Sequence, residues 1–92
     1  MADVLVYMRP TCGYSQRAMS LLRKKGVQFE TVDISANPER RQEMIDRSNG
    51  RSTVPEIFIN GRHIGGCDDL MELEGSGQLD PMLAEQSSGA PA

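Results

Sequence analysis

The feature that most restricts the fold is an unbroken apolar run near the start of the chain, Val4-Leu5-Val6-Tyr7-Met8. Its residues are rich in strand formers and do not alternate with polar ones, which is typical of a strand covered on both faces. We therefore expect this run to be the central strand of a sheet. A chain of 92 residues has no room for two hydrophobic cores, so we expect a single domain.

A helix and a second strand are predicted directly after this run. Residues 9–11 interrupt the strand, and apolar residues then recur at helical spacing from Tyr14 to the basic pair and glycine at 24–26. Residues 28–34 contain β-branched and aromatic residues that partly alternate with polar ones, which indicates a strand. Two strands joined by a helix form a right-handed βαβ unit.

A hairpin is predicted further along the chain. Asn60-Gly61 separates Ile57-Phe58-Ile59 from Arg62-His63-Ile64. Both turn residues tolerate the positive φ angles of a type I′ turn, which is the preferred connection of two antiparallel strands. The hairpin would bring the number of strands to four.

Three further helical segments complete the pattern. The first is expected to start at Asn37-Pro38, with the asparagine as cap and the proline in the first helical position. The second covers residues 68–74, and the third starts at Asp80-Pro81. This order predicts an α/β fold, a four-stranded mixed sheet flanked by helices, over residues 1–85. Small and polar residues at 86–92 predict a disordered C-terminal tail.

Cys12 is the best candidate for a reactive centre. It lies in Pro10-Thr11-Cys12-Gly13-Tyr14-Ser15, between the first strand and the first helix. The unpaired N–H groups and the positive dipole end of a helix start favour thiolate over thiol, and the cation of Arg9 acts in the same direction. The alternative is a buried, inert cysteine. The position at a helix start favours nucleophilic sulfur chemistry.

Composition excludes several other classes of protein. A net charge of −3 argues against a nucleic-acid-binding surface. No apolar stretch reaches the roughly 20 residues that a membrane span needs, and the N-terminus does not resemble a signal peptide, so we expect a cytoplasmic protein. Two cysteines are too few for a disulfide scaffold or for a structural zinc site made of cysteines and histidines.

Three motifs occur together, and each follows or precedes a predicted strand. They are Arg-Pro-Thr-Cys-Gly-Tyr-Ser at 9–15, Thr-Val-Pro at 53–55 and Gly-Gly-Cys-Asp-Asp-Leu at 65–70. Together they resemble the glutaredoxins, which have the thioredoxin-like fold, and the match extends to about Leu83. The resemblance implies a glutathione-dependent thiol–disulfide oxidoreductase. Cys12 would attack mixed disulfides of glutathione with proteins or small molecules, and a second glutathione would release it.

The resemblance also implies a glutathione site. Its residues would be Arg9, Tyr14, Thr53, Val54, Pro55, Gly66, Cys67 and Asp68. Arg9 would attract the glycine carboxylate unless it is a solvated surface charge, and Tyr14 would shape the groove unless it packs in the core. Val54 would pair with the tripeptide through its main chain, before a cis bond to Pro55. Thr53 would flank that groove.

The helix start at Gly66 would bind the other end of the tripeptide. Its N–H groups can hold the γ-glutamyl carboxylate. Asp68 or Asp69 would accept the ammonium group or cap the helix, and the resemblance favours Asp68 for the ligand. Arg51 either adds charge near the glycine carboxylate or is an exposed loop arginine.

The chain departs from dithiol glutaredoxins at Ser15, where these have a second cysteine. Serine cannot close an intramolecular disulfide, so a monothiol mechanism is expected; Ser15 can instead cap the helix or hydrogen-bond the sulfur. Cys67 is either a second redox thiol or a small hydrophobe whose backbone alone contributes. His63 is expected to be a surface strand residue.

A second hypothesis is a binding and transfer module, in which two chains share a 2Fe–2S cluster held by Cys12 and two glutathione molecules. Gly13, in place of the usual proline, could open the helix start to a cluster. The enzyme hypothesis predicts a monomer without metal, and the cluster hypothesis a dimer. A thioredoxin-type protein reductase is a weaker third option, because Ser15 denies it a partner thiol.

Overall fold

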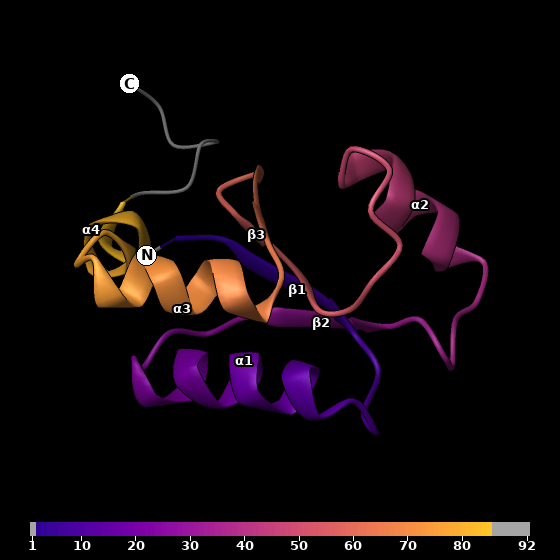
Figure 1. The fold of residues 1–92 in the computed structure, drawn as a ribbon, viewed down its shortest axis with the longest axis horizontal. Helices are drawn as coiled ribbons and strands as arrows, with labels where there is room; N and C mark the ends of the chain where they lie inside the picture. Colours follow the sequence, from indigo (N-terminus) through magenta and orange to yellow (C-terminus); the bar gives the residue numbers. More distant parts are fainter. Residues whose placement is uncertain (1, 86–92) are drawn as a thin grey trace.

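The computed structural model describes residues 2–85, which form four strands and four helices around one sheet (Figure 1). In chain order these are β1 (Val4–Met8), α1 (Gly13–Lys24), β2 (Glu30–Asp33), α2 (Arg40–Arg47), β3 (Glu56–Ile59), β4 (Arg62–Gly65), α3 (Cys67–Gly75) and α4 (Leu79–Ala84). The strand order is β2-β1-β3-β4, with β1 parallel to β2 and antiparallel to β3. The predicted mixed sheet is confirmed, and β1 lies inside it as expected.

The side chains of β1 alternate between two hydrophobic clusters, one on each face of the sheet. Val4, Val6 and Met8 pack into the larger cluster together with residues of α1, α3 and α4. Tyr7 points the other way, into a smaller cluster that includes Met44 of α2. Both faces of β1 are therefore covered, which explains why its sequence has no polar alternation. Each fully buried aliphatic side chain contributes about 1.5–3 kcal/mol to folding.

The hairpin between β3 and β4 forms as predicted. Asn60 and Gly61 have φ angles of 53° and 80°, the positive values that a type I′ turn needs. Asn60 also ties this turn to the start of β1, because its N–H donates to the carbonyl oxygen of Asp3 at 2.7 Å. The N–H of Asp3 in turn donates to Oδ1 of Asn60 at 2.9 Å.

The second helix starts two residues later than predicted, at Arg40 instead of Pro38. α2 begins at Arg40, whose N–H donates to the carbonyl oxygen of Asn37 at 2.9 Å, so this segment is a tight turn rather than helix. The side chain of Asn37 donates to the main-chain oxygen of Asp33 at 3.1 Å and does not cap α2. The second strand is shorter than predicted and covers 30–33 instead of 28–34, with a separate turn at 34–36 after its end.

The C-terminal tail predicted at residues 86–92 lies outside the described residues. The domain boundary predicted at residue 85 therefore stays a prediction. Between residues 2 and 85, no helix has the length and apolar character that crossing a membrane requires.

Candidate active site around Cys12

Cys12 occupies the N-cap position of α1, one turn after the end of β1. Its φ and ψ angles of −84° and 120° are extended, and its carbonyl oxygen accepts the first helical hydrogen bond, from the N–H of Gln16 at 3.0 Å. Its own N–H donates to the carbonyl oxygen of Arg9 at 3.1 Å. The half-exposed thiol therefore lies over the unpaired N–H groups of the first helical turn.

These surroundings lower the pKa of the Cys12 thiol below its usual value. The largest cause is the N–H of Ser15, which donates to the sulfur and stabilises the thiolate. Partial burial raises the pKa, but the Ser15 hydroxyl, the N–H of Tyr14 and the positive charge of Arg9 lower it further. A larger fraction of Cys12 is therefore thiolate at neutral pH than in an ordinary exposed cysteine.

Ser15 is wholly buried in the first turn of α1, facing Cys12. Its hydroxyl hydrogen-bonds the sulfur, and its Oγ accepts from the N–H of Arg9 at 3.4 Å. Of the two roles predicted for Ser15, hydrogen bonding to the sulfur is the one that the lowered pKa of Cys12 supports. The contact also fixes the main chain of Arg9, whose side chain is exposed.

The second motif reaches Cys12 through Val54. The Val54–Pro55 peptide bond is cis, as the resemblance implied. The thiol of Cys12 lies 3.9 Å from the carbonyl oxygen of Val54, to which the S–H donates. Pro55 is buried and Val54 half-buried, so the main chain of this loop forms a wall next to the sulfur.

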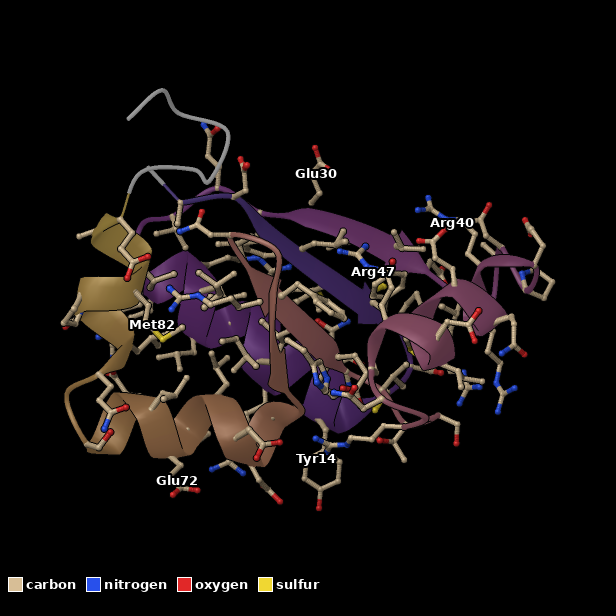
Figure 2. The ribbon with its side chains drawn as sticks, turned by 90° about the horizontal axis from the view of Figure 1, so that it is seen from above. Tyr14, Glu30, Arg40, Arg47, Glu72 and Met82 are labelled. Atoms are coloured by element: carbon tan, nitrogen blue, oxygen red, sulfur yellow. The ribbon has the colours of Figure 1, made fainter. Side chains whose placement is uncertain are left out.

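A hollow of about 140 Å³ lies along this wall and brings the three motifs together. Its lining residues are Tyr14, Arg51, Thr53, Val54, Pro55, Gly66, Cys67, Asp68 and Asp69. Tyr14 is 61% exposed and projects away from the body of the protein (Figure 2), so the core-packing alternative is wrong for it. Cys12, the exposed Arg9 and Gly13, and the buried Ser15 are not among the lining residues.

The start of α3 closes the far side of the hollow, and its two aspartates play different parts. Asp69 accepts from the N–H of Gly66 at 2.9 Å and pairs with Arg51 at 3.1 Å. The Gly66 N–H, followed by the Arg51 guanidinium, holds the pKa of Asp69 below its usual value. Asp68 is exposed. Asp69 therefore caps α3, and the carboxylate of Asp68 stays at the solvent-facing rim of the hollow.

Gly65, just before α3, has to be a glycine. Its φ of 119° lies in the region that side chains rarely adopt, and an added Cβ would come within 2.3 Å of the Asp69 carboxylate and 2.9 Å of the Arg51 guanidinium. Because residue 65 has no side chain, the Asp69–Arg51 ion pair can lie directly against the backbone there, beside the hollow.

Cys67 lines the hollow but is 4% exposed, and both cysteines are free. Burial is the main reason that the pKa of its thiol is raised. Cys67 is therefore a protonated thiol at neutral pH, packed against the larger core cluster. This environment favours the small-hydrophobe alternative over a second redox thiol.

The sequence analysis missed a buried carboxylate behind the hollow. Glu56 is wholly buried at the start of β3, and its Oε1 lies 2.6 Å from Nε2 of His63. The expectation that His63 is a surface strand residue is therefore wrong, since its side chain is 16% exposed and its ring lies 5.1 Å from that of Phe58. An acidic residue directly before the apolar Ile57-Phe58-Ile59 was the available signal.

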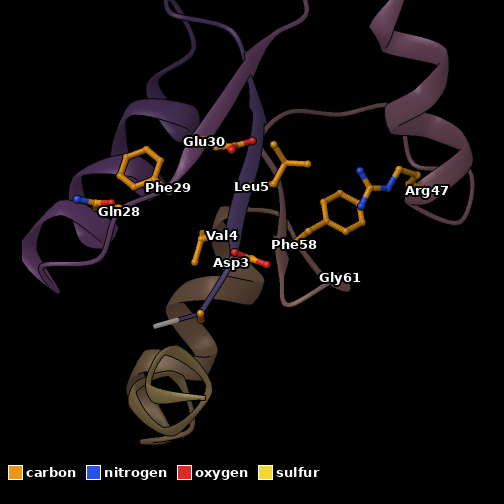
Figure 3. A pocket seen from close by; sticks show the side chains of 10 residues that line it. Asp3, Val4, Leu5, Gln28, Phe29, Glu30, Arg47, Phe58 and Gly61 are labelled. Carbon is orange, nitrogen blue, oxygen red and sulfur yellow. The ribbon is translucent and has the colours of Figure 1, made fainter. Parts of the chain in front are cut away.

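A larger hollow, of about 620 Å³, lies at the other end of β1 and does not include Cys12 (Figure 3). It lies between the start of β1, the start of β2 and the side chains of Phe58 and Arg47. Across residues 2–85, no group of three or more His, Cys, Asp or Glu side chains is arranged to hold a metal ion. The smaller hollow is the one that residues of the three motifs line, and Cys12 contacts its wall at Val54.

Comparisons with known proteins identify the family. The glutaredoxin family model matches residues 4–64 of the chain. Glutaredoxin 3 of Escherichia coli K12 is 54% identical over 83 residues, which cover 90% of this chain and 99% of that protein. The chain belongs to the glutaredoxin family. It is thus a thiol redox protein, as the three motifs predicted.

Solved glutaredoxins share the fold. The solution structure of glutaredoxin from Brucella melitensis is 49% identical and superimposes with a TM-score of 0.79, covering 100% of this chain and 96% of that one. The crystal structure of a buckwheat glutaredoxin in complex with glutathione is 34% identical with a TM-score of 0.80, covering 89% and 76%. These likenesses confirm the thioredoxin-like fold of this glutaredoxin.

Proposed function

We propose that this glutaredoxin reduces glutathione mixed disulfides by a monothiol mechanism. The observation that carries the proposal is the thiol of Cys12, which has a lowered pKa and contacts a wall of the hollow that the three motifs line. A relative of the same fold has been crystallised with glutathione, which supports the tripeptide as the occupant of this groove.

The reaction has two displacement steps. The thiolate of Cys12 attacks the glutathione sulfur of the mixed disulfide, whose S–S bond breaks, and the substrate sulfur leaves as a thiolate that takes up a proton. The thiolate of a second glutathione then attacks the glutathione sulfur bound to Cys12, forming oxidised glutathione and regenerating the Cys12 thiolate. Ser15 has no sulfur with which to intercept the intermediate, so one thiol carries both steps.

The middle of the glutathione molecule would lie along the loop before Pro55. In the proposed pose the main chain of Val54 pairs with the extended tripeptide, and Thr53 flanks it at the edge of the hollow. The cations of Arg9 and Arg51 attract the glycine carboxylate, and an arginine can bind a carboxylate with two parallel hydrogen bonds. The exposed ring of Tyr14 forms the outer wall beside the sulfur.

The γ-glutamyl end would lie at the start of α3. The N–H groups of Cys67 and Asp68 are among the unpaired donors of the first helical turn and would hold the α-carboxylate. The exposed carboxylate of Asp68 would accept the ammonium group. The engagement of Asp69 with Gly66 and Arg51 supports this division, because that carboxylate already has partners.

The proposed partners are glutathione, glutathionylated proteins and small mixed disulfides. A net charge of −3 makes nucleic acid an unsuitable partner. We place the reaction in the cytoplasm, where the glutathione pool keeps thiols reduced, and propose that the enzyme acts as a monomer.

Glutathione-dependent turnover of a small mixed disulfide tests this function. Substitution Cys12→Ser should lower the rate to that of uncatalysed exchange, because serine cannot form a mixed disulfide. The matched control is Cys67→Ala, which removes the other thiol and should leave turnover within about twofold of the parent. Equal turnover in the parent and the Cys12→Ser protein would refute the proposal.

A 2Fe–2S cluster is a second candidate function, and the geometry at Gly13 favours keeping it. A Cβ added to Gly13 would meet no atom within 4 Å, so the helix start next to Cys12 is open. One chain offers a single half-exposed thiol there, so a cluster would need a second chain and two glutathione thiolates as its other ligands. Anaerobic reconstitution with iron, sulfide and glutathione should then give a coloured dimer; a colourless monomer would eliminate this candidate.

A further inference from the structure

Glu56 is a buried acidic residue that the proposed reaction does not use. It is the first residue of β3, directly after Pro55, and its side chain has no exposed surface. A carboxylate that is removed from water needs compensating hydrogen bonds or cations, or it destabilises the fold. Its partners are therefore the first indication of its role.

The two carboxylate oxygens of Glu56 face different parts of the protein. Oε1 lies 2.6 Å from Nε2 of His63 on β4. Oε2 accepts from the hydroxyl of Thr53 at 3.2 Å and lies 3.7 Å from Nε of Arg51. The imidazole is held in turn by the ring of Phe58, whose centroid is 5.1 Å away. The carboxylate is thus fixed from behind by β4 and turned toward the loop that lines the hollow.

Arg51 is held at two points of its guanidinium group. Nε faces Glu56, and Nη1 donates to Oδ2 of Asp69 at 3.1 Å. The remaining nitrogen, Nη2, lies 3.5 Å from the position that a Cβ on Gly66 would occupy, beside the start of α3. The side chain of Arg51 is 46% exposed. Two carboxylates therefore hold the inner edge of the guanidinium while the rest of it faces the hollow.

We propose that Glu56 is a positioning residue: its buried carboxylate, held by His63, fixes Arg51 in the orientation that receives the glycine carboxylate of the glutathione moiety. Glu56 does not touch the ligand and acts through Arg51. A flexible arginine side chain loses conformational freedom when it binds, and fixing it beforehand removes that loss. This inference rests on the proposed glutathione-dependent function. It adds Glu56 as a residue through which the enzyme selects ligands with a free glycine carboxylate.

Substitution Glu56→Gln tests the inference with little change in shape. The amide oxygen can still accept from His63, but the amide NH₂ then faces Arg51 and Thr53 and offers no acceptor to the guanidinium. Two probes are used with the full chain: a mixed disulfide of glutathione, and the same compound with the glycine carboxylate converted to an amide. Glu56→Gln should raise KM for the acid probe about three- to tenfold, with little change in kcat or in KM for the amide probe.

A double-mutant cycle shows whether Glu56 acts through Arg51. In an Arg51→Gln background, Glu56→Gln should cause no further loss in the preference for the acid probe over the amide probe. The matched control is Glu85→Gln, which removes the partner of Arg62 in an exposed ion pair of 2.8 Å and should leave both probes unchanged.

A second variant covers the possibility that Glu56→Gln does not fold. His63→Ala removes the group that holds the same carboxylate from behind and should lower the acid-over-amide preference in the same direction. An equal rise in KM for both probes, or an unchanged preference in these variants, would overturn the inference and leave the proposed function standing. An inactive parent protein would instead contradict the proposed function itself.

Discussion

The sulfur of Cys12 lies 3.9 Å from the carbonyl oxygen of Val54, 42 positions further along the chain. This contact joins the start of α1 to the loop before β3, two segments that are far apart in the sequence. In the proposed pose, a tripeptide paired with the Val54 main chain would have its sulfur next to the Cys12 thiolate. Positioning of this kind lowers the barrier of a displacement reaction without any additional catalytic group.

Alkylation should separate the two cysteines by pH. Because the pKa of Cys12 is lowered, its rate of reaction with iodoacetamide should reach half of its maximum at a lower pH than that of an ordinary free thiol. Buried Cys67, whose pKa is raised, should stay unmodified in the folded protein. Peptide mass spectrometry after timed alkylation measures both sites. Preferential labelling of Cys67 would contradict the geometry described.

Ser15→Ala should shift the pH dependence of Cys12 alkylation to higher pH. The hydroxyl is lost while the Ser15 N–H, the largest cause of the lowered pKa, remains, so the shift should be partial. A lowered pKa in the folded state also stabilises the fold. That stabilisation is complete above the pKa of the unfolded thiol and disappears as the pH falls through the folded pKa. Unfolding by urea at several pH values should therefore show a smaller pH-dependent gain in stability for Ser15→Ala than for the parent.

Ser15→Cys should introduce an intramolecular disulfide. Residues three apart in the first turn of a helix are close enough for their sulfurs to bond, and Ser15 faces Cys12. Oxidation should lower the mass by two hydrogens and give activity toward protein disulfides. The control is Ser20→Cys on the same helix, whose position about 12 Å further along the axis is out of reach. A disulfide in the control, or none at position 15, would disprove this prediction.

Gly65→Ala should destabilise the fold by about 1–3 kcal/mol. The new Cβ would collide with the Asp69 carboxylate at a backbone φ of 119°. Gly75→Ala serves as the control, because a Cβ there meets no atom within 4 Å, and alanine near the end of α3 should stabilise it by about 0.5–1 kcal/mol. The free energy of unfolding in urea measures both changes, and equal values would contradict the close approach at Gly65.

Tyr7→Phe should lower the free energy of unfolding by about 1–2 kcal/mol. The buried Tyr7 hydroxyl donates to Glu43 and accepts from Nη1 of Arg47 at 2.9 Å, and removing it leaves both groups short of a partner. The same substitution at Tyr14, whose side chain is largely exposed, should leave stability unchanged. Thermal or urea denaturation of the two variants provides the comparison; a larger loss at position 14 would be inconsistent with this packing.

Where the sequence failed, a long-range contact was responsible. Asn37-Pro38 has the composition of a helix start, but the side chain of Asn37 bonds the end of β2 at Asp33, and the helix begins later. His63 alternates as a surface strand residue would, yet it faces the buried Glu56. The roles of Asp68 and Asp69 could not be separated either, because only the position of Arg51 decides which of the two is paired.

The sequence by itself determined the parts of this protein that depend on neighbouring residues. The apolar run of β1, the positive φ angles at Asn60-Gly61 and the thiol at a helix start follow from periodicity, turn chemistry and the helix dipole, which act over a few residues. The tertiary structure decided what Cys12 meets at Val54 and what surrounds Glu56. Those contacts join segments that are distant in the chain, and only the packing of the two core clusters brings them together.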